Sequence, residues 1–283
     1  MEFVGSVIWI SGIRFDIKFA VVYLTWYTKD PRKHHMDIAI YLLQYLWHTR
    51  SLVLVLGGKA KISAMSYCDS SYGKGKSGRS IGANLVKMNE EAGAISAKVS
   101  ATTSTKLSSF EAEMDSRAEG VKALLFADHL AEELQIKDRP IPAQYNDNLA
   151  LKMFLEGNGS AKGIRHIELR MFYLRELGEM GKVEYKFKEG VNLQVDGLTK
   201  AKSSKEFEKN RIDIMGHGLL QFLKNEVDSN KSLNLSGNDR GYASNSNSGN
   251  NSDNKSLNLS GNDRGYTIKS CSNKNSESEN DNG

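Results

Sequence analysis

Four acidic residues stand out because each falls where a predicted strand or helix begins or ends. Asp69 ends a predicted strand, Glu113 lies in the first turns of a long predicted helix, and Asp147 and Asp196 each precede a predicted helix. Carboxylates that converge without basic partners repel one another and raise their own pKa values, and divalent cations relieve that repulsion. Two Mg²⁺ or Mn²⁺ ions about 3.5–4 Å apart can activate a water and stabilise the leaving oxygen of a phosphodiester. Any single acid is more often an exposed residue or a helix cap, so the prediction of a two-metal site depends on the four together.

The elements that must position these acids follow from the spacing of apolar residues. Runs that are apolar or alternate in polarity predict strands at 52–58, 62–69, 80–88, 92–100, 141–146 and 183–189. Apolar residues at intervals of three and four predict two buried helices at 15–27 and 34–49. They also predict helices at 108–134, from Asp147 onward, at about 160–179, and after Gly190. An antiparallel meander followed by β–α alternation indicates a mixed α/β sheet. If its first and fourth strands are neighbours, Asp69 and Asp147 lie side by side at one end.

Composition and charge narrow the class of protein. The 283 residues are 39% hydrophobic and 25% charged, as in globular proteins, and the net charge of +4 permits a polyanionic partner. The two cysteines, Cys68 and Cys271, are too few and too far apart for a disulfide framework or a cysteine zinc site. No apolar stretch reaches ~18 residues, and Glu2 stands where a signal peptide carries a basic residue. We therefore expect an intracellular protein, cytoplasmic or nuclear, that is neither secreted nor in a membrane.

Residues 229–283 differ from the rest of the chain in composition. They contain 13 Ser and 14 Asn among 55 positions, and KSLNLSGNDRGY occurs twice, at 231–242 and 255–266. Such a segment cannot bury enough apolar area to offset the entropy of ordering its backbone. We predict a disordered tail with a duplicated motif.

Several ordered blocks resemble the C-terminal part of a Ty/copia-type retrotransposon polyprotein, where the end of the reverse transcriptase is followed by a ribonuclease H domain. The blocks are SYCDSSYG (66–73), ISAKVSATTSTKLSSFEAEM (95–114), YNDNLAL (145–151), RHIELRMFYLRE (165–176) and VNLQVDGLTK (191–200). Upstream, FDIKFAVVY (15–23) is similar to a block that follows the polymerase palm. The resemblance covers about residues 4–216.

The resemblance implies a ribonuclease H-like fold, a mixed five-stranded sheet flanked by helices, that cuts the RNA strand of an RNA–DNA hybrid. It assigns the metal ligands to Asp69, Glu113, Asp147 and Asp196, with two Mg²⁺ ions, or Mn²⁺ as the alternative. The implied organisation is a helical remnant of reverse transcriptase at 1–60, a ribonuclease H-like domain at 61–200, a helical extension at 201–228 and the tail at 229–283.

The sequence also departs from this family. The polymerase palm is absent, so polymerase activity is not expected. Phe172 stands where the family usually has His, Ala97 where it has Trp, and Met114 where it has Tyr. None of these differences removes a metal ligand, yet a degraded copy of a retrotransposon accumulates substitutions of this kind. An inactive remnant that keeps the fold and weak nucleic-acid binding is therefore the alternative function.

Candidate nucleic-acid contacts lie outside the acids. Lys74, Lys76 and Arg79 form a basic turn that suits phosphates, which would make binding salt-dependent, and this turn lacks the phosphate-loop pattern. His166 belongs to a family block, although a histidine beside apolar residues on a helix is more often structural. Asn192 lies four residues before Asp196. The Leu-Thr-Lys tripeptide at 198–200 predicts no chemistry by itself.

A different enzyme class is the remaining alternative for the acids. A strand-transfer enzyme of the integrase type shares the sheet and uses three acids, and Asp147 and Glu184 are 37 residues apart. This alternative is disfavoured because Glu184 falls in a predicted strand, and because three acids would leave Glu113 and Asp196 unexplained.

Residues 4–58 carry all three tryptophans, and we expect them to pack on the nuclease domain and leave an apolar patch exposed. Such a patch predicts self-association or binding to a separate reverse transcriptase chain.

Overall fold

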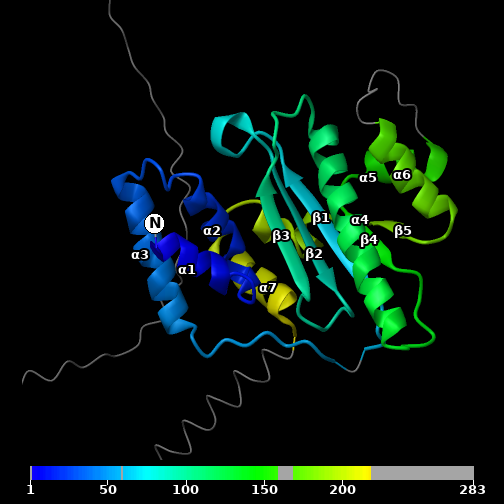
Figure 1. Cartoon of the computed structure of the whole chain (residues 1–283), viewed down its shortest axis with the longest axis horizontal. Helices are drawn as coiled ribbons and strands as arrows, with labels where there is room; N and C mark the ends of the chain where they lie inside the picture. The colour runs from blue at the N-terminus through cyan, green and yellow to red at the C-terminus, as the bar shows by residue number, and fades with distance from the viewer. Residues whose placement is uncertain (1, 59, 159–167, 218–283) are drawn as a thin grey trace, which may run out of the picture.

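A computed structural model of the chain describes residues 2–58, 60–158 and 168–217. The predictions for the tail at 229–283 and for His166 lie outside the described residues. Among the described residues, one mixed sheet contains β1 (Met65–Ser71), β2 (Ile81–Lys87), β3 (Ser96–Ala101), β4 (Ala143–Asn146) and β5 (Glu184–Phe187), in the order β3-β2-β1-β4-β5 (Figure 1). The first three strands are antiparallel, and β4 runs parallel to β1 and to β5. The predicted mixed five-stranded sheet is confirmed, and β1 and β4 are neighbours.

Helices precede, flank and follow this sheet (Figure 1). They are α1 (Glu2–Ile10), α2 (Lys18–Thr25), α3 (Lys33–His48), α4 (Ser109–Glu133), α5 (Leu149–Met153), α6 (Glu168–Glu179) and α7 (Ser204–Met215). Short turns of other helix types are η1 (Phe15–Ile17), η2 (Lys76–Gly78), η3 (Phe154–Asn158), η4 (Gly190–Asn192) and η5 (Asp196–Leu198). The long helix begins as predicted, because the Ser108 side chain accepts a hydrogen bond from the Glu111 amide at 3.2 Å.

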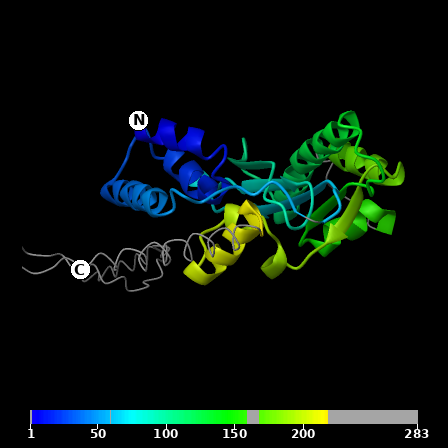
Figure 2. The same ribbon diagram turned by 90° about the horizontal axis from the view of Figure 1, so that it is seen from below.

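Apolar side chains pack on both faces of the sheet. On one face, α4 packs with α5 and α6 through Met114, Val121, Leu151 and Leu174. On the opposite face, α7 and η5 pack with residues of α2 and with Phe15. Figure 2 shows α7, in yellow, on the side of the sheet away from α4, in green. Helix α4 lies so close to β1 that a Cβ added at Gly120 would overlap the sulfur of Cys68. This close approach places the first turns of α4 beside the end of β1.

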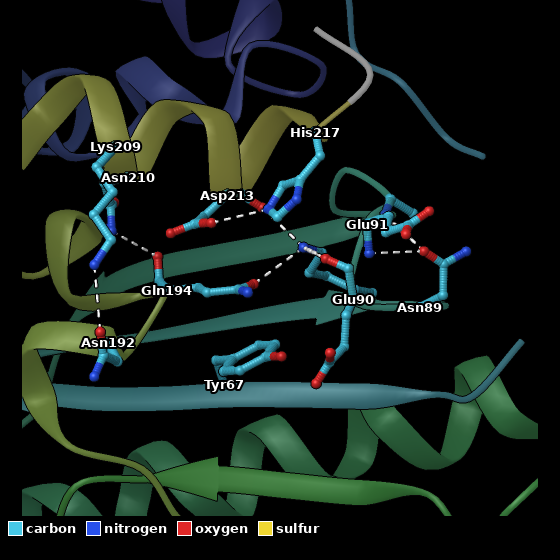
Figure 3. A network of polar contacts seen from close by, with 12 residues as sticks. Tyr67, Asn89, Glu90, Glu91, Asn192, Gln194, Lys209, Asn210, Asp213 and His217 are labelled. Carbon is cyan, nitrogen blue, oxygen red and sulfur yellow. Dashed lines mark hydrogen bonds and ion pairs between the residues drawn. The ribbon is translucent and has the colours of Figure 1, made fainter. Parts of the chain in front are cut away.

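Helix α7 is tied to the sheet by a buried lysine. The Nζ of Lys87 donates hydrogen bonds to the Glu90 carbonyl at 2.9 Å, the Gln194 side chain at 3.1 Å and the Asp213 carbonyl at 3.0 Å. Figure 3 shows the same region, where the Asn210 side chain donates to the Gln194 carbonyl at 3.0 Å. Strand β2, the loop before η5 and α7 are therefore held together by polar contacts as well as by apolar packing.

Some predicted elements are wrong. Residues 52–58 belong to no strand. Val55 donates a backbone hydrogen bond to Met215 at 2.8 Å and accepts one from Gly93 at 2.7 Å. The prediction that the helix at 34–49 is buried is also wrong, because α3 leaves one apolar side exposed. The helix expected at Asp196 is a single turn of 3-10 helix.

The N-terminal helices have a small core of their own and an uncovered side. Val7, Val21 and Leu42 are buried in that core. Trp9 is 80% exposed and Trp47 is 67% exposed. Other exposed apolar side chains on this part of the chain are Ile8, Ile13, Met36, Ile40 and Leu43. The predicted exposure of apolar side chains on this segment is confirmed, whereas their joining into one patch stays a prediction. None of the helices in the described ranges combines the length and the hydropathy that crossing a bilayer requires.

Candidate metal centre

Three of the four predicted acids meet at the carboxyl ends of β1 and β4. One carboxylate oxygen each of Asp69, Glu113 and Asp147 lies within 4.8 Å of the other two. Asp69 comes from β1, Glu113 from the second turn of α4, and Asp147 from the junction between β4 and α5. Asp69 and Glu113 are buried, and Asp147 is the most exposed of the three. The parallel pairing of β1 with β4 brings them together, as the sequence predicts.

Glu113 is held in place by polar groups from both strands. Its Oε1 accepts hydrogen bonds from the Ser70 amide at 3.2 Å and the Ser70 hydroxyl at 3.0 Å. Its Oε2 accepts one from the Asn146 side chain at 2.8 Å, and the same Asn146 nitrogen donates to the Cys68 carbonyl at 2.9 Å. These contacts fix the carboxylate of Glu113 relative to the ends of β1 and β4.

The cluster has an unfavourable negative charge of its own. Burial, followed by repulsion from Asp147 and Asp196, raises the pKa of Asp69 to about 6, although the hydroxyl of Thr199 donates to this carboxylate and opposes the rise. Burial and then the charge of Asp69 raise the pKa of Glu113 to about 7. Burial is also the main reason that the pKa of Asp147 is raised. The site therefore favours binding of a positive charge or a proton.

Asp196 does not join this cluster in the described part of the structure. It is buried, and its two carboxylate oxygens form ion pairs with the ammonium groups of Lys200 and Lys202. Its charge is still close enough to raise the pKa of Asp69 and of Asp147. Its assignment as a metal ligand stays a prediction.

The segment that carries Asp196 is positioned by its neighbours. A Cβ added at Gly190 would lie 2.9 Å from Asp147 Oδ2, so a larger residue would press on that carboxylate. Lys209 of α7 donates to the side chain of Asn192 at 3.3 Å (Figure 3). Asn192 is exposed and is bonded to α7. It is not a member of the acid cluster.

The basic turn lies beyond the end of β1, at the same end of the sheet as the cluster (Figure 1). Lys74 and Arg79 are exposed. Lys76 is exposed too, but its Nζ donates to the Trp26 carbonyl at 2.9 Å and lies 5.1 Å from the centre of the Tyr27 ring. The turn can present positive charge to a polyanion, with Lys76 also bracing it against α2.

Sequence reasoning missed several residues around the acids. Ser70, Asn146, Thr199, Lys200 and Lys202 all bond directly to one of the four carboxylates. The sequence did contain a signal for Ser70 and Asn146. Each is next to one of the acids at the end of a strand, and the two strands are neighbours, so both side chains lie at the same end of the sheet. The Leu-Thr-Lys tripeptide acquires a role: its threonine bonds to Asp69 and its lysine pairs with Asp196.

The donor set fits a divalent cation. Three carboxylates offer hard oxygen ligands, which suit Mg²⁺ and Mn²⁺. Burial first, and then repulsion between the acids, raises the pKa values of Asp69 and Glu113, and a bound cation would oppose both effects. Asp69, Glu113 and Asp147 are the residues that would hold such an ion.

No family model matches the chain. The N-terminal RNase H domain of a Mycobacterium tuberculosis protein is 11% identical, covers 53% of this chain and 96% of that chain, and has a TM-score of 0.37. LC11-RNase H1, isolated from compost, is 13% identical, covers 52% of this chain and 96% of its own, and has a TM-score of 0.38. We assign the ribonuclease H-like fold from the order and directions of the five strands, which agree with the predicted fold.

One curated relative connects the chain to transposons. A stretch of 58 residues is 34% identical to a transposon Ty5-1 protein of Saccharomyces cerevisiae. The match covers 20% of this chain and 19% of the yeast protein, so the chain spans about a fifth of the length of that relative. The predicted resemblance to a retrotransposon protein is confirmed.

Proposed function

We propose that this chain is a ribonuclease H of a Ty/copia-type retrotransposon, which hydrolyses the RNA strand of RNA–DNA hybrids. The observation that carries the proposal is the cluster of Asp69, Glu113 and Asp147 at the carboxyl ends of two parallel strands. Two Mg²⁺ ions, or Mn²⁺, are the proposed cofactors, with Asp196 completing the ligand set. Residues 1–60 are then a remnant of reverse transcriptase, and 61–200 the nuclease domain.

The chain's own residues have defined tasks in this proposal. Bound divalent ions lower the pKa of a coordinated water and stabilise the leaving oxygen of a phosphodiester. Ser70 and Asn146 hold the carboxylate of Glu113, and Thr199 holds that of Asp69. Lys74 and Arg79 neutralise phosphates of the hybrid, so binding weakens as salt rises. His166 and Asn192 are proposed as further contacts.

A cleavage assay on a labelled RNA–DNA hybrid tests the proposal with the full chain. Cleavage should require Mg²⁺ or Mn²⁺, leave a 3′-hydroxyl on the RNA, and stop in Asp69→Asn. The matched control is Asp37→Asn, which removes the same charge from an exposed position on α3. Cleavage that continues undiminished in EDTA would contradict a metal-dependent mechanism.

An inactive remnant is the second candidate. The observation in its favour is that Lys200 and Lys202 take up the carboxylate of Asp196, which leaves the cluster with three acids. In that case the hybrid would bind in a salt-dependent way, but no metal would produce cleavage. The same assay, combined with a binding measurement, separates the two functions.

The exposed apolar side chains on α1 and α3 support a partner for the N-terminal helices. Trp9 and Trp47 are the largest exposed side chains there. We propose self-association or binding to a separate reverse transcriptase chain, which light scattering at high concentration tests. A strict monomer without dye binding to apolar surface counts against it.

We also propose an intracellular location, cytoplasmic or nuclear. The buried Cys68 is a free thiol among the described residues, which is compatible with a reducing compartment.

A further inference from the structure

Lys200 and Lys202 both pair with the single carboxylate of Asp196. Lys200 contacts Oδ1 and Lys202 contacts Oδ2, so both oxygens face ammonium groups. The Asp196 side chain is only 5% exposed, and a carboxylate so deeply buried requires a counter-charge. Two lysines here supply the neutralisation that a divalent cation would otherwise provide.

The lysine pair and the acid cluster share one electrostatic environment. Asp196 raises the pKa of Asp69 and of Asp147, and Lys200 lowers both, so these charges act on one another across the site. Thr199, which precedes Lys200, bonds to Asp69 through its hydroxyl. The segment 196–202 therefore carries the fourth acid, its two lysine partners and a threonine that bonds to Asp69.

We propose that Lys200 and Lys202 act as intramolecular cations that keep a second metal ion off Asp196. The free protein then takes up one divalent ion at Asp69, Glu113 and Asp147, and a second only after the lysines leave Asp196. This inference deepens the proposed function and rests on it. The two lysines differ in mobility, because the Lys200 side chain is 52% exposed and that of Lys202 only 15%. Lys200 can leave into solvent, whereas Lys202 must give up a mostly buried position.

Titration with Mn²⁺ tests this without measuring activity. The electron paramagnetic resonance signal of free Mn²⁺ counts the ions bound to the full chain at each concentration. Wild type should bind one ion tightly and a second only weakly. The double variant Lys200→Gln/Lys202→Gln should bind the second ion at least about tenfold more tightly, because two repelling charges next to its ligand are gone. Adding Asp196→Asn to that variant should remove the gain.

A second lysine–acid–lysine arrangement supplies the matched control. Lys98 and Lys122 pair with Glu119 at 2.9 Å and 2.8 Å, and all three side chains are well exposed. Lys98→Gln/Lys122→Gln removes the same net charge and should leave the Mn²⁺ isotherm unchanged. An equal gain in this control, or no gain in Lys200→Gln/Lys202→Gln, overturns the inference.

Failure to fold and failure of the proposed function are both distinguishable from failure of the inference. If circular dichroism shows that the double variant is unfolded, Lys200→Gln alone removes the more exposed charge and should tighten the second ion by about threefold. An unchanged isotherm in the single variant overturns the inference as well. If Asp69→Asn does not weaken the first ion, the metal site itself is refuted. If it does, and the second ion ignores the lysines, only the inference fails.

Discussion

Replacing Asp69 by Asn should make the metal-free protein more stable at neutral and alkaline pH. Burial and the neighbouring acids raise the pKa of Asp69 from its ordinary value of 3.8 to about 6 in the folded chain. A carboxyl whose pKa is raised on folding favours the folded state while it is protonated. The stability it contributes is fully present below pH 3.8 and is lost as the pH rises through 6. Asn keeps the shape and an acceptor for the Thr199 hydroxyl but carries no charge.

The magnitude follows from the size of the shift. A rise of about two pKa units corresponds to about 3 kcal/mol of unfolding free energy once Asp69 is ionised, which is an upper bound. Because the charge of Asp69 also raises the pKa of Glu113, its replacement relieves both groups and the two shifts are not summed. We expect Asp69→Asn to gain about 1–3 kcal/mol at pH 8 in EDTA. At roughly 2–4 °C per kcal/mol, the melting temperature rises by several degrees.

Urea and thermal unfolding in EDTA at pH 8 and at pH 4.5 measure this difference. The gain should shrink at pH 4.5, where the wild-type carboxyl is mostly protonated in the folded chain. The exposed-acid control Asp37→Asn should change stability little at either pH. Added Mg²⁺ should raise the melting temperature of wild type and not of Asp69→Asn. An Asp69→Asn variant no more stable than wild type at pH 8 would refute the conclusion that this cluster is electrostatically strained.

Three further outcomes are expected from the rest of the fold. Gly120→Ala should lower the unfolding free energy by at least about 1–3 kcal/mol in a urea titration, because its Cβ would overlap the Cys68 sulfur. Arg14→Met should lower it by about 3–5 kcal/mol, because it leaves the fully buried carboxylate of Asp16 without its ion-pair partner, 2.7 Å away. Deleting 229–283 should leave the melting temperature within about 1 °C of wild type by calorimetry, because the segment has too few apolar residues to form a packed core.

The parts of the site that depend on local signals could be predicted from the sequence. Asp69 ends an apolar strand, and Ser108 caps a helix whose second turn carries Glu113, so both positions follow from short-range rules. The parallel placement of β4 beside β1 was a conditional step, and it brought Asp147 to the same edge. Element ends, rather than whole elements, were therefore sufficient to predict that Asp69, Glu113 and Asp147 meet, but the predicted cluster of four acids also included Asp196, which lies outside it.

The rest depends on contacts between distant segments. Residues 52–58 have the composition of a strand, yet they bond to Met215 and Gly93 on either side and enter no sheet. The apolar residues around α3 predict burial on all sides, and the structure leaves Met36 and Trp47 exposed. Apolar composition alone does not say whether a surface is covered by the same chain.

The surroundings of Asp196 show that an acid with two lysine partners does not have the same role at every position in the fold. Glu119 and Asp196 each have two lysine partners. Around Glu119 the side chains are exposed, and hydrogen bonds from Lys122 and Lys98 lower the pKa of Glu119 to about 2, with little effect on stability expected from such a surface arrangement. Asp196 is buried and pairs with Lys200 and Lys202, and its charge acts on Asp69 and Asp147. In our proposal, these lysines must leave Asp196 before another cation can replace them. Burial, which the linear sequence does not encode locally, separates the exposed arrangement around Glu119 from the one around Asp196, for which we propose a control on metal binding.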